Sequence, residues 1–261
     1  MNKKSRISEA FAGRKAFVAF LTGGDPDVET TEKLIPVMAE AGADVIEIGI
    51  PFSDPVAEGP VIQAADERAL SAGCTTDKLF DMVARVRDKT SVPLLFMTYL
   101  NPIFTYGAER FFQRCSETGI DGVIVPDMPF EEKSEIASSC SKFGVELVSL
   151  IAPTSRDRIR KIAAEAEGFI YCVSSLGVTG VRSEIKSDVT SMIEQVRAVT
   201  DVPCAVGFGV SRPEHAEQLG AVADGVIVGS AIVKIIAENG HESALPVSDF
   251  IRSMRAALDK N

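Results

Sequence analysis

The sequence of 261 residues has no tryptophan, only two histidines and five scattered cysteines. No two cysteines form a CxxC pair, and the histidines, His215 and His241, add no spacing that suits zinc. An odd number of cysteines without a framework of pairs indicates reduced thiols, which predicts a cytoplasmic protein. Neither a disulfide scaffold nor a metal site is therefore expected, and no cofactor is expected in this chain.

Long apolar runs and runs of basic residues are also missing. The apolar segment 17–21 follows a basic N-terminus but is too short for the core of a signal peptide, and no run is long enough to span a membrane. The formal net charge is -10. Without a basic patch, binding to nucleic acid or to an anionic membrane surface is not expected. An anionic ligand must be held by local features of a site.

Short β-branched runs alternate along the whole chain with segments of helical periodicity. Strict alternation predicts a parallel sheet with right-handed crossovers, and eight repeats in a chain of this length predict a single (β/α)₈ TIM barrel domain over residues 1–261. A doubly wound open sheet is the alternative, but no GxGxxG follows the first strand. The expected strands are 17–21, about 45–48, 94–98, 123–125, 145–151, 169–173, one within 200–209 and one within 222–230.

Several local features of this barrel are also expected. An extra amphipathic helix should lie within the first fifteen residues, and Asp25 should cap the helix after the first strand, with Pro26 at its first position. Residues 101–104 should form a loop. The connections after strands two and six are unusually long and rich in glycine or proline. In a barrel both lie at the C-terminal ends of the strands, where active sites are built, so we expect them to act as lids.

Glycines gather after the last three expected strands, in the segments 177–180, 207–209 and 229–230. Barrels frequently bind phosphate with the loops after strands seven and eight and the N-terminus of a short extra helix, for which residues 230–237 are suited. Any one of these segments alone is better explained by an ordinary turn. Together, at the ends of three neighbouring strands, they favour a phosphate site.

Two carboxylates occupy unusual positions for structural residues. Glu47 lies within an apolar strand and should share the inward face of Val45, where apolar neighbours raise its pKa. Glu58 lies in the loop that follows, so the pair could supply two groups for proton transfer. The alternative is a buried structural glutamate and a solvated loop glutamate. Asp127, at the end of strand four, is a rival that could equally serve as a turn or cap residue, and Asp54 also suits a turn.

Other kinds of chemistry lack their residues. No lysine lies in any expected strand, so a Schiff-base aldolase would have no nucleophile. The two histidines fall away from strand ends, which disfavours a histidine-ligated metal epimerase, and no Ser/His/Asp set converges. Acid/base chemistry on a phosphorylated substrate remains.

Five segments of the chain resemble the tryptophan synthase α subunit family: FVAFLTGGDPD, EIGIPFSDPVAEGPVIQ, GVTG, GFGVSRPEH and GSAIVKII. The resemblance runs from about Phe17 to Ile236. It implies a (β/α)₈ barrel that cleaves indole-3-glycerol phosphate to indole and glyceraldehyde 3-phosphate in tryptophan biosynthesis. It also implies a partner, the pyridoxal-phosphate β subunit of an α2β2 complex, which receives indole through a tunnel.

The resemblance also implies roles for single residues. Glu47 matches the catalytic glutamate of the family, and Glu58 takes the place of its catalytic aspartate. The residues expected to bind phosphate are Gly180, Phe208, Gly209, Gly229 and Ser230. The residues expected to line the indole and glycerol pocket are Phe20, Tyr99, Tyr171 and Thr179, although packing in the barrel core is an alternative for the aromatic ones. The loops expected to contact the β subunit are 51–55, 101–104 and the one at Pro129.

The chain departs from the family pattern at two positions. Glu58 is one methylene longer than the usual aspartate, and Ser175 stands where an arginine is often found. Neither change removes the chemistry. Two alternatives stay open: a stand-alone lyase that releases free indole, and a non-catalytic homologue that binds a phosphate ligand and acts as an allosteric partner. A sugar-phosphate isomerase is disfavoured, because EIGIPFSDP has no evident use there.

Overall fold

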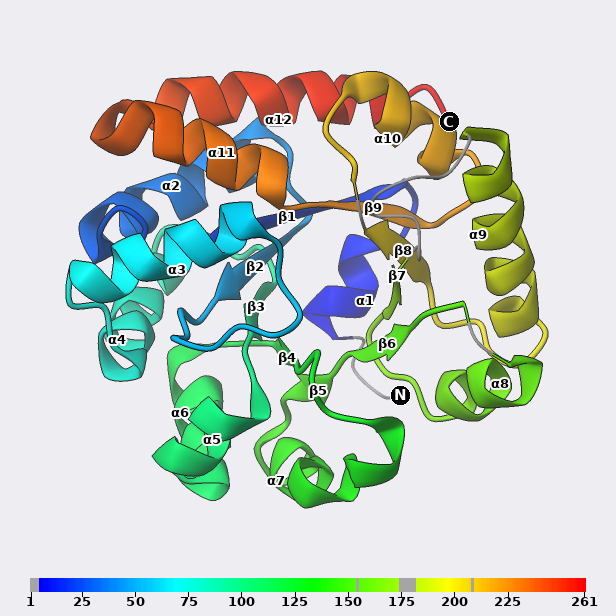
Figure 1. Cartoon of the computed structure of the whole chain (residues 1–261), viewed down its shortest axis with the longest axis horizontal. Helices are drawn as coiled ribbons and strands as arrows, with labels where there is room; N and C mark the ends of the chain where they lie inside the picture. Colours follow the sequence, from blue (N-terminus) through cyan, green and yellow to red (C-terminus); the bar gives the residue numbers. More distant parts are fainter. Residues whose placement is uncertain (1–4, 154, 174–181, 208) are drawn as a thin grey trace.

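The computed structural model describes residues 5–153, 155–173, 182–207 and 209–261. In this part of the chain, nine parallel strands form one sheet in the order β5-β4-β3-β2-β1-β9-β8-β7-β6. Helices surround the sheet on its outside (Figure 1). The strands are β1 (Ala16–Thr22), β2 (Val45–Gly49), β3 (Leu94–Met97), β4 (Gly122–Ile124), β5 (Glu146–Leu147), β6 (Ser149–Ile151), β7 (Ile170–Val173), β8 (Cys204–Gly207) and β9 (Gly225–Val228).

The expected fifth strand, residues 145–151, is divided into β5 and β6. The first part pairs with β4 and the second with β7, which are the two ends of the rest of the sheet. Between them, the N–H of Val148 donates to the carbonyl of Val123 over 3.0 Å. Strands of a barrel are staggered, so one segment meets its two neighbours at different heights. The division therefore marks the closure of the predicted barrel.

Helices follow the strands in the order that the sequence predicts, and two local predictions need correction. The α-helices of the described residues are α1 (Arg6–Ala10), α2 (Val28–Ala41), α3 (Pro60–Ser71), α4 (Thr76–Arg87), α5 (Leu100–Tyr106), α6 (Ala108–Thr118), α7 (Ser134–Phe143), α8 (Arg156–Ala164), α9 (Arg182–Arg197), α10 (Pro213–Gly220), α11 (Ser230–Asn239) and α12 (Ala244–Leu258). Two short 3₁₀ helices are η1 (Phe130–Glu132) and η2 (Gly240–Glu242).

The first correction concerns the cap of α2. Asp27, not Asp25, caps this helix, because its side chain accepts a 2.7 Å hydrogen bond from the N–H of Thr30. Asp25 is buried and accepts two hydrogen bonds of 2.8 Å from the Arg68 guanidinium instead. Its partner lies far along the chain, so local pattern could not reveal it.

The second correction concerns residues 101–104, which lie in helix α5 and not in a loop. The helix begins at Leu100, whose N–H donates to the Asp127 carboxylate over 3.0 Å. The Asp127 carboxylate, from another loop, thus accepts the hydrogen bond that a local N-cap side chain would otherwise accept.

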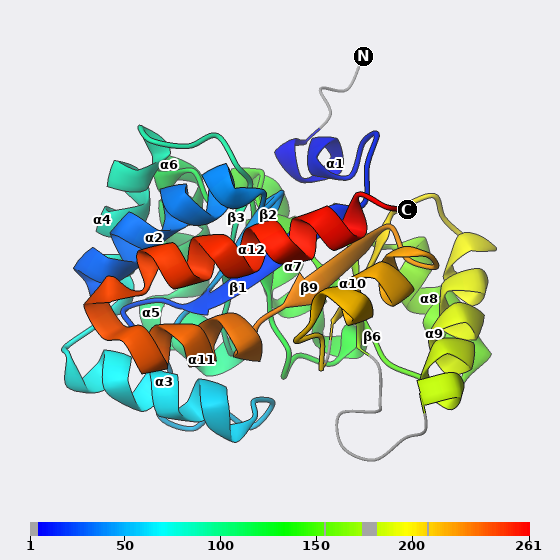
Figure 2. The same cartoon turned by 90° about the horizontal axis from the view of Figure 1, so that it is seen from above.

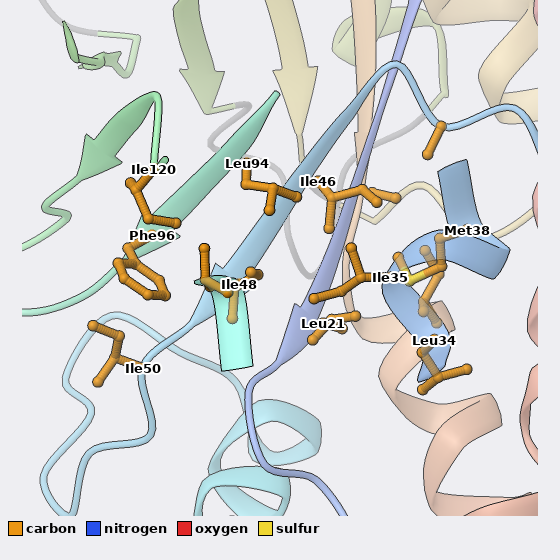
Figure 3. Packing of buried hydrophobic residues seen from close by; sticks show 14 of the residues in the cluster. Leu21, Leu34, Ile35, Met38, Ile46, Ile48, Ile50, Leu94, Phe96 and Ile120 are labelled. Atoms are coloured by element: carbon orange, nitrogen blue, oxygen red, sulfur yellow. The ribbon is translucent and has the colours of Figure 1, made fainter. Parts of the chain in front are cut away.

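Apolar side chains form two layers, one on each face of the sheet. The outer layer lies between strands and helices; near α2, the side chains of Leu21, Ile46 and Ile48 lie close to those of Leu34, Ile35 and Met38 (Figure 3). The inner layer fills the barrel with alternate residues such as Val18, Val45 and Leu95. Both faces of the strands are therefore buried, which explains their nearly continuous apolar runs.

The two ends of the barrel differ. Helix α1 covers the N-terminal end, where Ile7 joins the inner layer and Phe11 stacks on Phe169 with ring centroids 5.3 Å apart. Figure 2 shows α1 and α3 at opposite ends of the barrel. The C-terminal end, where α3 and α11 begin, is the one left for a site.

The cysteines agree with the prediction of unpaired thiols, since all five are free and buried. None of the helices in the described ranges combines the length and apolar composition that a bilayer crossing requires.

Candidate active site

Glu47 is a fully buried carboxyl group at the C-terminal end of β2. It points into the barrel from β2 on the same face as Val45, as predicted, and it is 0% exposed. Neither of its oxygens has a hydrogen-bond partner among the described residues. Burial raises the pKa of Glu47 from 4.5 to about 8, which confirms the predicted direction. At neutral pH, Glu47 is therefore mostly a protonated acid.

Two aromatic side chains flank Glu47. Phe20 is its register partner on β1 and is 5% exposed. Tyr171, on β7, is close enough that the charge of Glu47 adds to burial in raising the pKa of the phenol. The family resemblance of the sequence predicted both aromatic residues at this site, and the structure brings them together with Glu47.

Glycines on the adjoining strands make room for these rings. A Cβ atom at Gly207 would lie 2.6 Å from Oη of Tyr171, and one at Gly49 would lie 2.7 Å from Cζ of Phe20. Such contacts are too short for a side chain, so both positions require glycine while the rings stay in place. Sequence reasoning missed this role for Gly49 and assigned Gly207 only to a phosphate loop.

Tyr99 supports the loop of residues 50–59, which joins β2 to α3. Its Oη accepts a 3.0 Å hydrogen bond from the N–H of Ala57, and its ring lies 5.4 Å from that of Phe52. Burial, with the nearby charges of Glu58 and Asp66, raises the pKa of Tyr99 to about 12. Tyr99 therefore lies beside the predicted catalytic loop and helps to fix its course.

Glu58 lies at the end of this loop and is paired with a second acid. Its carboxyl group forms a hydrogen bond with that of Asp66 on α3, and burial raises the pKa of Glu58. Asp66 was not predicted as part of the site. It lies on the buried face of α3 with Ile62, Ala65 and Ala69, and an acid on such an apolar stripe is the signal that could have revealed it.

The rival carboxylates have structural partners. Asp127 accepts its hydrogen bond from the first N–H of α5, which fits the cap role left open for it. Asp54 is exposed and accepts a hydrogen bond of 2.5 Å from its neighbour Ser53.

Three residues predicted to hold phosphate lie at the described part of the C-terminal end. Gly209 has a φ of 68°, a conformation that favours glycine, and no atom would obstruct a Cβ atom there. Gly229 precedes α11, and Ser230 is the first residue of that helix. The first N–H groups of a helix have no partner within it, and they attract anions. Three of the predicted residues, Thr179, Gly180 and Phe208, lie outside the described residues, as does Ser175.

Helices α3 and α11 meet over Phe20. The ring packs against Ile62 and Ala65 of α3 and against Val233 of α11. Phe20, the register partner of Glu47, thus contacts both the helix that follows the Glu58 loop and the helix that begins at Ser230. In the described ranges, no group of three or more His, Cys, Asp or Glu side chains is suited to hold a metal ion.

Comparison with known proteins gives the family of this barrel. The sequence profile of the family "Tryptophan synthase alpha chain" matches residues 8–259. The chain belongs to the tryptophan synthase alpha chain family. A tryptophan synthase alpha chain from Lacticaseibacillus casei is 44% identical over 98% of this chain and 96% of its own length.

Solved structures agree with this membership of the tryptophan synthase alpha chain family. Tryptophan synthase subunit alpha from Legionella pneumophila str. Paris is 36% identical, with a TM-score of 0.90 over 99% of this chain and 100% of that chain. A chain of the tryptophan synthase α2β2 complex from Pyrococcus furiosus is also 36% identical, with a TM-score of 0.86 over 93% of this chain and 98% of that chain. The predicted family and the predicted barrel are both confirmed.

Proposed function

We propose that this chain, as one barrel domain, is a carbon-carbon lyase that cleaves indole-3-glycerol phosphate to indole and glyceraldehyde 3-phosphate in tryptophan biosynthesis. Family membership supports the reaction. The observation that carries the chemistry is Glu47, a fully buried carboxyl group that has no partner among the described residues. Such a group is costly to keep unless it is used.

Glu47 acts first as an acid and then as a base. Its carboxyl proton is transferred to C3 of the indole ring, which gives a cationic indolenine. The bond between C3 and the glycerol side chain then breaks, and its electron pair restores the C2–C3 double bond of indole. The Glu47 carboxylate takes the proton of the hydroxyl on the side-chain carbon that was bonded to C3, and this carbon becomes the aldehyde. The protons balance, so Glu47 ends the cycle protonated, as its raised pKa favours.

Two further groups assist this cleavage. The Glu58 carboxylate accepts a hydrogen bond from the indole N–H and stabilises the positive charge that develops there. Gly209, Gly229 and Ser230 hold the phosphate at the N-terminus of α11, with Gly180 and Phe208 as further contributors. The aromatic side chains of Phe20, Tyr99 and Tyr171, with Thr179, line the pocket for indole and glycerol.

The partner is a tryptophan synthase β subunit in an α2β2 complex, with pyridoxal phosphate bound to the β subunit and not to this chain. The relative from Pyrococcus furiosus belongs to such a complex. Exposed apolar side chains support a contact at the C-terminal end: Val56 in the loop after β2 is 81% exposed, and Phe104 on α5 is 48% exposed. The free, buried cysteines suit a cytoplasmic enzyme.

The test is indole formation from indole-3-glycerol phosphate by the purified chain, alone and with a tryptophan synthase β subunit added. The chain contains no tryptophan, so indole fluorescence has little protein background. Slow indole release that rises on addition of the β subunit is the expected result. Binding of the substrate without release of indole, in both cases, would refute the proposed reaction and favour a non-catalytic partner.

A further inference from the structure

Asp66 lies at the candidate active site, although no sequence motif identified it. It is 4% exposed, within the first two turns of α3, and its carboxyl group forms a hydrogen bond with that of Glu58. Two ionised carboxylates in direct contact repel each other, and a hydrogen bond between them needs a proton on one of the two. One of the two carboxyl groups therefore keeps a proton in the folded chain.

Asp66 contacts both ends of the loop of residues 50–59. The Asp66 carboxyl group also accepts a hydrogen bond from the backbone N–H of Phe52, near the start of the loop, while Glu58 lies near its end. Gln63, on the same helix, donates from Nε2 to the backbone carbonyl of Glu58 over 2.8 Å. Helix α3 thus holds the loop at several points, and Asp66 holds the Glu58 side chain itself.

No neighbouring cation in the described ranges pairs with either carboxyl group, so the negative charge of the pair is reduced by a proton that the two groups share. Among the described residues, no lysine or arginine forms an ion pair with Glu58 or Asp66. The nearby Arg68 is engaged by Asp25. Tyr99 faces both carboxyls and is itself near Asp127, and Asp25 adds its charge to the field at Asp66.

Asp66 is the better holder of the proton. Burial, followed by the charge of Glu58, raises the pKa of Asp66 to about 8. Asp66 is 4% exposed, whereas Glu58 is only partly buried at the end of the loop, so a negative charge costs more at Asp66 than at Glu58. Oε2 of Glu58 is buried and accepts no hydrogen bond from an N–H or hydroxyl group in the described ranges. A proton on Asp66 supplies a donor for the Glu58 carboxylate.

We propose that Asp66 is a positioning residue, which keeps one proton and donates it in a hydrogen bond that holds the Glu58 carboxylate ionised and directed toward the substrate. This inference rests on the proposed role of Glu58 at the indole N–H. Because Glu58 has one methylene more than the aspartate of the family, its carboxyl group has the reach to engage both Asp66 and the substrate. When the shared proton is lost at alkaline pH, two negative charges face each other and Glu58 is displaced.

The first test compares substitutions at Asp66 by the kcat for indole release at about pH 7. The side-chain amide in D66N would accept from the Phe52 N–H and donate to Glu58, whereas the methyl group in D66A can do neither. We therefore expect D66N to stay within about threefold of wild type and D66A to lose at least about tenfold. Glu67→Gln is the matched control, since it removes an exposed acid from the same helix, and it should not change kcat. Wild-type kcat in D66A would overturn the proposal.

The second test needs neither substrate nor turnover. The side-chain carboxyl carbon of Glu58, assigned with Glu58→Gln, is followed by ¹³C NMR as pH rises in the ligand-free chain. In wild type, its shift should change in two steps, the second reporting loss of the shared proton, while D66N should show a single step. Identical titration curves in wild type and D66N would overturn the shared proton.

The two tests separate the positioning role from the proposed function. If wild type releases no indole but the NMR coupling is present, the proposed function fails and the proton-sharing pair stands. If wild type releases indole and Glu58→Gln abolishes it, but D66N leaves the Glu58 titration unchanged, the function stands and the role of Asp66 is refuted.

Discussion

Glu47 and Tyr171 lie near each other inside the barrel, on β2 and β7, so that charge on Glu47 raises the pKa of the Tyr171 phenol. With Phe20 as the register partner of Glu47, two aromatic rings lie beside one fully buried carboxyl group inside the barrel. An acid in such surroundings stays protonated at neutral pH, which is the state that the first proton transfer of the proposed reaction needs.

Replacement of Glu47 by glutamine should abolish most of the activity and leave the fold intact. The amide has the shape of the acid but can neither give nor take the proton, so kcat should fall by at least about 10²-fold. Steady-state indole release measures the effect, and circular dichroism checks the fold. Near wild-type turnover by E47Q would disprove the role of Glu47.

The same variant should change how stability depends on pH. In the folded chain the pKa of Glu47 is about 8, against 4.5 normally, so between these values the unfolded chain binds fewer protons at this group. Wild-type stability therefore falls as pH rises through this window. E47Q lacks this loss, and its stability relative to wild type should rise by about 1.4 kcal/mol per pH unit within the window.

Urea unfolding at about pH 5.5, 6.5 and 7.5 measures this difference, with Glu67→Gln as a control for removal of an exposed acid from the site-proximal helix. A constant difference between E47Q and wild type across these values would show that the pKa of Glu47 is not raised in the folded chain.

Tyr99→Phe should loosen the loop of residues 50–59. It removes the oxygen that accepts the Ala57 N–H but keeps the ring beside Phe52. We expect a loss of about 1 kcal/mol in stability, because one partly buried N–H loses its partner. We also expect kcat to fall roughly tenfold, because Glu58 is held less well. Unfolding and indole-release measurements report the two effects.

Tyr106→Phe is the matched control for Tyr99→Phe. It removes a phenol that donates to Asp77 at an exposed position, so it should leave kcat unchanged. If the two variants had the same kcat, Tyr99 would have no special part in placing the loop.

Asp127 should prove structural. Asp127→Ala removes the acceptor for the first N–H of α5, and losing a cap costs about 1 kcal/mol. The kcat for indole release by the chain alone should stay within about twofold of wild type, while a loss as large as that expected for E47Q would return Asp127 to the catalytic candidates.

The pattern of the sequence was sufficient wherever a local rule decides the outcome. Alternation along β2 predicts that Glu47 shares the inward face of Val45, and that is what the structure has. Rules of this kind hold because the period of a strand is two and one face is packed.

Local rules failed where a distant residue decides. Asp25 reads as a helix cap, but Arg68, from another helix, binds it, and Asp27 takes the cap. The division of strand five follows from the stagger of barrel closure, which no single segment encodes. Asp66 could be found by its position on an apolar stripe, but its pairing with Glu58 depends on how the loop folds back.

The proposed phosphate site at the start of α11 can be tested by a change that has opposite effects on stability and binding. Ser230→Asp places a negative charge at the first residue of this helix, where it favours the helix by about 0.3–1 kcal/mol. The same charge repels a bound phosphate. We expect KM for indole-3-glycerol phosphate to rise at least about tenfold, equivalent to about 1.4 kcal/mol.

Ser134→Asp is the matched control, because Ser134 is the exposed first residue of α7, and both α7 and α11 have 10 residues. Both variants should be at least as stable as wild type to urea. Only Ser230→Asp should weaken the binding of the substrate and of inorganic phosphate. If the two variants bound both ligands equally well, the N-terminus of α11 would have no part in holding phosphate.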